Sequence, residues 1–358
     1  MASNLDLIND ADGFPYQRDA DRVIYSFKLA GINATLGYVL PSVSQVLSCL
    51  PGWQVDDTQQ TVLLEGGQNV DDRSAAIKQS LLAMREKGSF SILQSWRDET
   101  FPIFGPHREV VLHIERCACP LFGVVTYGVH AVAYVPPLEP GQQLKIWIPR
   151  RARSKQTFGG MLDSSAAGGI ASGDTPFETL VRECGEEASL PSELVRRHAK
   201  AAGTVTNFYV RDHRSGGEVG LLQPECQYVF DLPLPPVVIC QPNDGEVEDF
   251  RLWKLDEIME ALAKREFKPN CAIVMLDFFV RHGILSSENE KDYLEIVVYI
   301  PAFLDQDQLE PTTKVTTMMK EEPSMNEREA KTFILLFLRC SSEQFQPFRS
   351  ERWRKSIL

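Results

Sequence analysis

The sequence has no apolar run of the roughly 18 to 20 residues that a membrane-spanning helix needs. The longest such run near its C-terminus covers only residues 333–338. There is no secretory signal segment at the N-terminus, and none of the eight cysteines forms a Cys-x-x-Cys pair. These absences speak against a membrane or disulfide-bonded protein and predict reduced, buried thiols in a cytoplasmic protein.

Basic residues are also scarce, because 37 Lys and Arg stand against 49 Asp and Glu, for a net charge of −12. Broad nucleic-acid binding needs a basic face, so we expect no nucleic-acid partner. An anionic substrate would need local help from a metal ion or a basic patch. The six histidines lack paired ligand spacing, and Cys117 and Cys119 lack partners at zinc spacing, so none of them is assigned to the chemistry. The oligomeric state is left open.

One stretch has glycine, arginine and glutamate at a fixed spacing. Gly168 is followed after five residues by Asp174, and seven residues later by Arg-Glu-apolar-x-Glu-Glu. Thr175 is a good N-cap, Pro176 suits the first helical position, and Glu178 completes a capping box, so a helix is predicted to begin here. The charged residues of the pattern are Arg182, Glu183, Glu186 and Glu187.

The predicted helix separates apolar from acidic residues. Its three glutamates lie three and four residues apart, and like charges at this spacing repel by a few tenths of a kcal/mol per pair. A divalent cation would turn that repulsion into coordination, and carboxylate oxygens suit Mg²⁺ or Mn²⁺. The alternative is a solvated acidic face, but the glycine loop, the cap and the full spacing together favour a metal site. The apolar face comprises Phe177, Leu180, Val181, Cys184 and Ala188.

The length of 358 residues suggests two domains. Residues 1–108 read as a small α+β accessory domain without a catalytic constellation; the alternative is that it also closes over the substrate site. Residues 109–297 alternate strands and helices, which predicts an α/β fold, with a mixed sheet in an α/β/α sandwich. Residues 298–358 contain a polar, aperiodic stretch and are expected to form a disordered or loosely packed tail.

The stretch 168–190 resembles the Nudix box of hydrolases that cleave diphosphates linked to another moiety. Asp174 stands where Glu is typical and Ser189 where Gly is typical. Further phrases are similar to a Nudix subfamily of fungi and plants that carries its own N-terminal extension, DUF4743, and a related module is fused to thiamine pyrophosphokinase in some fungi. This resemblance covers most of residues 1–297. The phrases lie at residues 144–155, 160–163, 167–173 and 267–272.

The resemblance implies a Nudix fold and metal-dependent hydrolysis of a small-molecule diphosphate. The implied substrates are thiamine diphosphate and, preferentially, its damaged oxo and oxy derivatives, with the monophosphate and phosphate as products. Glu186 and Glu187 become the principal metal ligands, and the Gly168 carbonyl a further one. Glu183 is another ligand or orients the water, while Arg182 fixes the carboxylate geometry. The sequence does not specify the ion.

A further metal ligand is expected from a distant loop, and a basic cluster precedes the box. Glu246 and Glu248 are the best candidates for this ligand and Glu225 the third, although each could be an exposed loop acid. The basic cluster is predicted to bind phosphate, with a solvated turn as the alternative. It comprises Arg150, Arg151, Arg153 and Lys155.

Two aromatic residues, Phe208 and Tyr209, could stack on a substrate ring, but such residues more often form the core of a strand. Tyr209, Arg211 and Gln223 are candidate hydrogen-bonding groups near predicted strand ends. Two other functions remain open: a Nudix enzyme acting on ADP-ribose or another nucleotide derivative, and a Nudix-fold module that binds without cleaving. The intact glutamates of the box argue against the second of these.

Overall fold

A computed structural model of the chain describes residues 1–14 and 23–299, and these all belong to one compact unit. Within this part of the chain, no helix is long and apolar enough to cross a membrane. Its seven cysteines are free thiols, and most are buried, as predicted. The predicted tail lies outside the described residues from residue 300 onward, and the helix and basic end expected within it lie there too.

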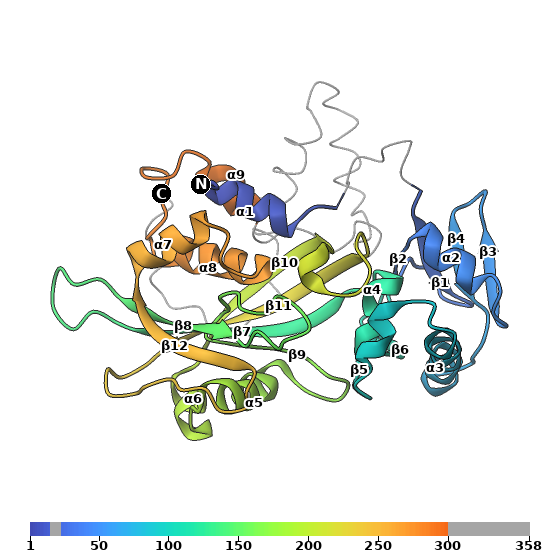
Figure 1. The fold of residues 1–358 in the computed structure, drawn as a ribbon, viewed down its shortest axis with the longest axis horizontal. Coiled ribbons are helices and arrows are strands. Elements are labelled where there is room, and N and C mark those ends of the chain that lie inside the picture. The colour runs from blue at the N-terminus through green and yellow to red at the C-terminus, as the bar shows by residue number, and fades with distance from the viewer. Residues whose placement is uncertain (15–22, 300–358) are drawn as a thin grey trace. The chain divides into compact units, whose positions relative to one another are not determined.

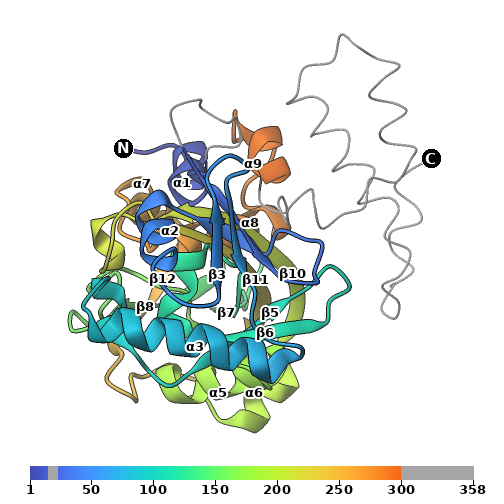
Figure 2. The ribbon, with the colours of Figure 1, turned by 90° about the vertical axis from the view of Figure 1, so that its right-hand side faces the viewer.

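The accessory region contains a four-stranded sheet with the order β2-β1-β4-β3 and a separate two-stranded sheet (Figure 1). Strands β1 and β4 run parallel, and the other neighbours are antiparallel. Helix α3 lies along β6 (Figure 2), and Asn69 caps its start by accepting a hydrogen bond from the Asp72 amide. The elements are β1 (Tyr25–Leu29), β2 (Gly37–Val39), α2 (Pro41–Leu47), β3 (Trp53–Asp56), β4 (Thr61–Leu64), α3 (Val70–Glu86), η1 (Ser91–Ser95), β5 (Thr100–Phe104), β6 (Val110–Glu115), η2 (Arg116–Ala118) and α4 (Cys119–Phe122).

The second region is built on a mixed sheet with the order β10-β11-β7-β8-β12, and β9 also pairs with β7. Strands β11 and β7 are parallel; the remaining pairs are antiparallel. Helices α5 and α6 cover one face, and α1, α7, α8 and α9 the other (Figure 1), so the expected sandwich is confirmed. The elements are α1 (Asn4–Ala11), β7 (Thr126–Val135), β8 (Lys145–Arg151), β9 (Ala166–Gly169), α5 (Pro176–Ala188), α6 (Ser192–His198), β10 (Lys200–Val210), η3 (His213–Ser215), β11 (Leu222–Pro233), β12 (Val247–Lys254), α7 (Leu255–Ala263), α8 (Pro269–Arg281) and α9 (Tyr293–Tyr299).

Two features cross the predicted boundary at residue 108, which stays a prediction. Helix α1 begins the chain but packs on α8, where Leu7, Ile8 and Ala11 join the core under the large sheet. Strand β6 follows the boundary but pairs with β5 of the accessory region. Burial of an apolar helix face decides the first case, and a short β-hairpin the second.

Helix α5 begins and ends as its sequence dictates. The Thr175 hydroxyl accepts a hydrogen bond from the Glu178 amide, and Pro176 opens the helix. The reciprocal half of the predicted capping box is wrong, because the Glu178 carboxylate accepts hydrogen bonds from Arg196 instead, one at 2.8 Å. Ser189 ends the helix at a φ of 55°, in the left-handed region. Glycine adopts this conformation without penalty, which accounts for the typical Gly at this position of the box.

Candidate active site

The acids of α5 stand at the edge of a cavity of about 650 Å³. Leu180, Val181, Cys184 and Ala188 bury the opposite side of the helix against the sheet. This is the predicted separation of apolar and acidic faces. The cavity is lined by residues of both regions, including the box residues Gly168, Asp174, Arg182, Glu183, Glu186 and Glu187.

Strand β9 and helix α5 hold two carboxylates in fixed places, so Gly168 lies in a strand and not in the loop that the sequence predicted. The Ala167 amide donates a hydrogen bond of 2.9 Å to Glu187. A Cβ atom on Gly168 would stand 2.0 Å from Glu183 Oε1, so only glycine leaves room for that carboxylate. Arg182 Nη1 lies 3.0 Å from Glu183 Oε1 and 2.9 Å from Glu186 Oε2. The guanidinium thus bridges two carboxylates, as expected for a residue that fixes their geometry.

Burial makes these carboxylates costly to ionise. It raises the pKa of Glu183 to about 7, against the lowering effect of Arg182. The pKa of Glu187 lies well above its usual value, first because of burial and then because of the neighbouring charge of Asp163. A divalent cation would stabilise the ionised forms, and the hard oxygen donors fit Mg²⁺ or Mn²⁺. The residues present therefore suit a metal ion of this class.

The two distal acids separate in the structure. Glu246 lines the cavity, where the Lys155 ammonium donates to its carboxylate. Glu248 lies outside the cavity lining, with its side chain 47% exposed and 3.7 Å from the Arg153 guanidinium. Glu225 also lines the cavity, but it accepts hydrogen bonds from Gln223 and Asn270 rather than joining the box acids. Glu246 is therefore the better placed of the two candidates.

The predicted basic cluster does not act as one patch. Arg151 is buried and pairs with Asp163, and Arg150 donates to the Gly160 carbonyl at 2.8 Å. Arg153 is 85% exposed in its side chain and lies outside the cavity lining. Only Arg151 and Lys155 of the four reach the cavity. Strand β8 separates Arg150 from Arg151, because successive side chains point to opposite faces of a sheet, and Arg153 and Lys155 lie in the turn that follows the strand.

The two aromatic candidates lie in the core of the fold, outside the cavity lining. Phe208 stacks on Phe14 with ring centroids 4.0 Å apart, and Tyr209 packs against Phe158. The alternative of strand core therefore describes their positions. Of the candidate hydrogen-bonding groups, Arg211 and Gln223 line the cavity, and Arg211 donates to Gln223 Oε1 at 2.6 Å.

A buried hydrogen-bonded group, of which His130 and Asp163 line the cavity, had no sequence signal. His130 Nδ1 lies 2.9 Å from the Ser164 hydroxyl, and the Cys271 thiol donates to Asp163. Among the described residues, His130, Asp163 and Cys271 form the one trio of possible metal ligands within 4.8 Å of each other. The Arg151 guanidinium already balances Asp163, and burial raises the pKa of the Cys271 thiol, so this group needs no cation.

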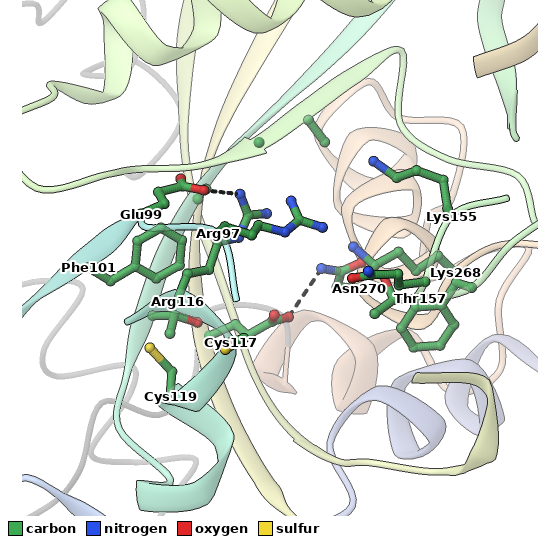
Figure 3. Close-up of a pocket in the computed structure, with 18 of the residues that line it drawn as sticks. Arg97, Glu99, Phe101, Arg116, Cys117, Cys119, Lys155, Thr157, Lys268 and Asn270 are labelled. Carbon is green, nitrogen blue, oxygen red and sulfur yellow. Dashed lines mark hydrogen bonds and ion pairs between the residues drawn. The ribbon is translucent and has the colours of Figure 1, made fainter. Parts of the chain in front are cut away.

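The accessory region also contributes residues to the cavity, as the alternative interpretation of residues 1–108 allowed. Arg97 and Arg116 face Lys155 and Lys268 across it (Figure 3). In all, the lining carries nine carboxylates and seven Lys or Arg side chains. Because acidic groups outnumber basic ones, a bound cation would favour the binding of an anionic ligand. The carboxylates are Glu99, Asp163, Asp174, Glu183, Glu186, Glu187, Glu225, Asp244 and Glu246. The basic residues are Arg97, Arg116, Arg151, Lys155, Arg182, Arg211 and Lys268.

Comparison with known proteins agrees with this geometry. A NUDIX domain model matches residues 128–271, and DUF4743, a domain of unknown function, matches residues 16–126. The chain is 38% identical over 250 residues to the uncharacterized protein YJR142W of Saccharomyces cerevisiae, covering 68% of this chain and 72% of that protein.

Plant and bacterial proteins match over smaller shares. The chloroplastic Nudix hydrolase 20 of Arabidopsis thaliana is 33% identical over 231 residues, covering 64% of this chain and 58% of the plant protein. The solved NUDIX domain of Shewanella oneidensis NrtR, complexed with ADP ribose, is 19% identical with a TM-score of 0.34, covering 46% of this chain and 91% of that one. The chain belongs to the Nudix hydrolase family, with a DUF4743 region ahead of its Nudix domain, and is a diphosphate hydrolase of this family, whose members generally use a divalent metal ion.

Proposed function

We propose that this enzyme hydrolyses thiamine diphosphate and, faster, its oxo and oxy derivatives to the monophosphate and phosphate. One observation carries the proposal: a single cavity holds the acids of the box together with a group of amide, carboxylate and cationic side chains. Its volume of about 650 Å³ has room for a diphosphate and an attached ring system. The similarity of residues 144–155 and 267–272 to the thiamine-related subfamily supports this choice of ring.

In this proposal, Glu186, Glu187 and the Gly168 carbonyl hold Mg²⁺ or Mn²⁺, with Glu183 as a further ligand or as the group that orients water. The ion, when bound, withdraws charge from the phosphate oxygens and acidifies water. Arg182 holds Glu183 and Glu186 at the spacing seen here. Glu246 is the distal acid, and its ion pair with Lys155 keeps both groups beside the box.

The organic end of the substrate would meet a chain of hydrogen bonds among other residues that line the cavity. Gln223 accepts from Arg211 at 2.6 Å and donates to Glu225 at 2.7 Å. Asn270 donates to the same carboxylate at 3.1 Å. Within residues 1–14 and 23–299, the buried Nε of Arg211 has no hydrogen-bond partner. That atom is itself out of reach of a ligand, so a ring substituent would meet the Glu225 carboxylate and the Arg211 guanidinium where these side chains line the cavity.

Such a group can discriminate between thiamine derivatives. The oxy form replaces an amino donor by a carbonyl acceptor, and the oxo form loses the cationic thiazolium. A site that offers fixed donors rejects a ligand that leaves them unpaired, because a buried unpaired polar group is costly. Arg211 would favour the carbonyl of the oxy form, whereas Glu225 would favour the amino group of the intact cofactor.

The test is competition kinetics with thiamine diphosphate, oxothiamine diphosphate and oxythiamine diphosphate at equal concentration, with Mg²⁺ or Mn²⁺, following monophosphate release by chromatography. The damaged forms should be cleaved faster. Equal rate constants would leave a general thiamine diphosphatase. Cleavage of ADP-ribose or another nucleotide, with none of the three thiamine compounds turned over, would overturn the proposal.

A further inference from the structure

The accessory region forms one wall of the active-site cavity. Arg97 and Arg116 reach into the cavity from this wall, opposite Lys155 and Lys268 (Figure 3). Both arginines come from residues outside the box, between η1 and α4. They therefore lie where they can contact a ligand that binds beside the acids of α5.

Arg116 is held firmly in this position. Its Nη1 donates to Glu99 Oε2 at 2.9 Å, and its guanidinium lies 5.3 Å from the centroid of the Phe101 ring. The Phe101 ring in turn rests on the end of β9, where a Cβ atom on Gly169 would stand 2.5 Å from Cζ. Arg116 is near enough to Glu183 to lower the pKa of that carboxyl, against the larger rise caused by burial.

Arg97 differs from Arg116 because its side chain has no counterion. Among the described residues, no carboxylate lies within ion-pair distance of its guanidinium. Its backbone amide donates to Glu115 Oε1 at 3.1 Å, so the segment itself is fixed. Arg97 is exposed to the cavity and acts on Glu246, whose pKa it lowers together with Lys155, against the rise caused by burial.

Hydrogen bonds to the Nudix domain anchor this segment on both sides of Arg97. On the N-terminal side, the Ser91 hydroxyl donates to Glu218 at 2.8 Å. On the C-terminal side, the Ser172 amide donates to the Thr100 carbonyl at 2.8 Å, and the Thr100 hydroxyl donates to the Ser172 hydroxyl at 3.2 Å. Arg97 is therefore a cation on a fixed backbone, facing a cavity whose ligand carries negative charge.

We propose that Arg97 and Arg116 bind the non-bridging oxygens of the substrate's diphosphate, so that the accessory region supplies part of the anion-binding site. The proposal rests on the proposed function only in taking a diphosphate as the ligand. Guanidinium groups suit phosphate because their paired donors match two oxygens at once. Arg116 keeps its place through Glu99, whereas Arg97 is free to bind.

The test measures binding of methylenediphosphonate, a diphosphate that cannot be hydrolysed, to the full chain with Mg²⁺ by titration calorimetry. Arg97→Gln and Arg116→Gln should each weaken binding by roughly tenfold or more, because each loses a charge-assisted contact. Lys78→Gln is the matched control: it removes one positive charge from α3, outside the cavity, and binding should stay within about twofold of wild type.

Two further variants separate ligand binding from a structural role. Arg97→Lys keeps the charge and should recover part of the lost affinity. Glu99→Gln keeps an acceptor for Arg116 but removes a competing negative charge, so affinity should hold or rise. A purely structural role predicts the opposite: weaker binding in Glu99→Gln, together with a lower melting temperature, and no recovery in Arg97→Lys.

The outcome is distinguishable from a failure of the proposed function. If none of the thiamine compounds is cleaved but methylenediphosphonate binding depends on both arginines, the substrate assignment is wrong and the anion site stands. If a thiamine compound is cleaved but Arg97→Gln binds methylenediphosphonate like wild type, the anion site is wrong. Absence of binding to the wild-type chain at millimolar concentration would also overturn it.

Discussion

The two walls of the cavity differ in the sign and the burial of their charged side chains. On the Nudix wall, Glu187 is buried and Glu183 is largely shielded from solvent, and this raises the pKa of both carboxyls. On the accessory wall, Arg97 is exposed and, within the described part of the chain, has no ion-pair partner. One wall therefore requires a cation, and the other offers one.

This difference separates two functions of the site. Buried acids on a capped helix suit a metal ion, because their positions are set by packing and barely relax. Exposed arginines on an anchored loop suit a ligand that enters and leaves. We therefore expect changes on the Nudix wall to act on turnover, and changes on the accessory wall to act on substrate affinity.

The largest effect is expected from Glu187→Gln, which keeps the shape of the side chain and removes its charge. Turnover should fall by about 100-fold or more, comparable to the loss of one strong electrostatic group in other active sites. The melting temperature at pH 7 should hold or rise, because a neutral group is cheaper to bury than this carboxylate. Glu193→Gln, on the exposed start of α6, is the control. Near-normal turnover of Glu187→Gln at saturating Mg²⁺ would show that Glu187 holds no metal.

A second prediction concerns His130, a buried histidine in the Nudix wall of the cavity. Burial lowers the pKa of His130 to about 4, from 6.5 in the unfolded chain. Below pH 6.5 the unfolded state therefore binds more protons, and stability is lost as the pH falls towards 4. Between pH 7.5 and pH 5 this amounts to about 2 kcal/mol of unfolding free energy.

Denaturant unfolding at these two pH values checks this prediction. His130→Gln should lose that part of the pH dependence, although removal of its Ser164 contact lowers stability at both values. His107→Gln, at an exposed position, should keep the full slope. Identical pH slopes for wild type and His130→Gln would show that His130 titrates normally.

An effect of similar size is expected at the contact between the walls. Gly169→Ala would place a methyl group 2.5 Å from the buried Phe101 ring, which should cost about 1 to 3 kcal/mol of unfolding free energy. The shift of Phe101 should also displace Arg116 and raise KM. Gly185→Ala is the matched control, because its nearest neighbour is 3.8 Å away and the helix should gain up to about 1 kcal/mol. Equal stability of the two variants would show that the Phe101 ring does not require glycine at position 169.

Sequence reasoning succeeded where a single element carries the signal. The cap at Thr175, the apolar face of α5 and the acids at Glu183, Glu186 and Glu187 depend on spacing within one helix, and the structure reproduces all three. It failed where neighbouring residues continue from a strand into a turn, because the chain changes direction there. Arg150, Arg151, Arg153 and Lys155 look like one patch in the sequence, but the strand and the turn send them to different places.

The sequence by itself determined the mixed sandwich, the box helix with its caps, and the chemistry of the carboxylates, because local periodicity and residue type specify these. Only the tertiary structure decided that Glu246 rather than Glu248 faces the box, and that Arg97, between η1 and β5, and Arg116, in η2, stand beside it. The physical reason is that these groups meet through Phe101 on Gly169 and through the Ser91 and Thr100 anchors, which join residues 68 to 127 positions apart. No local pattern encodes a contact of that range, since it depends on how two separately formed layers pack.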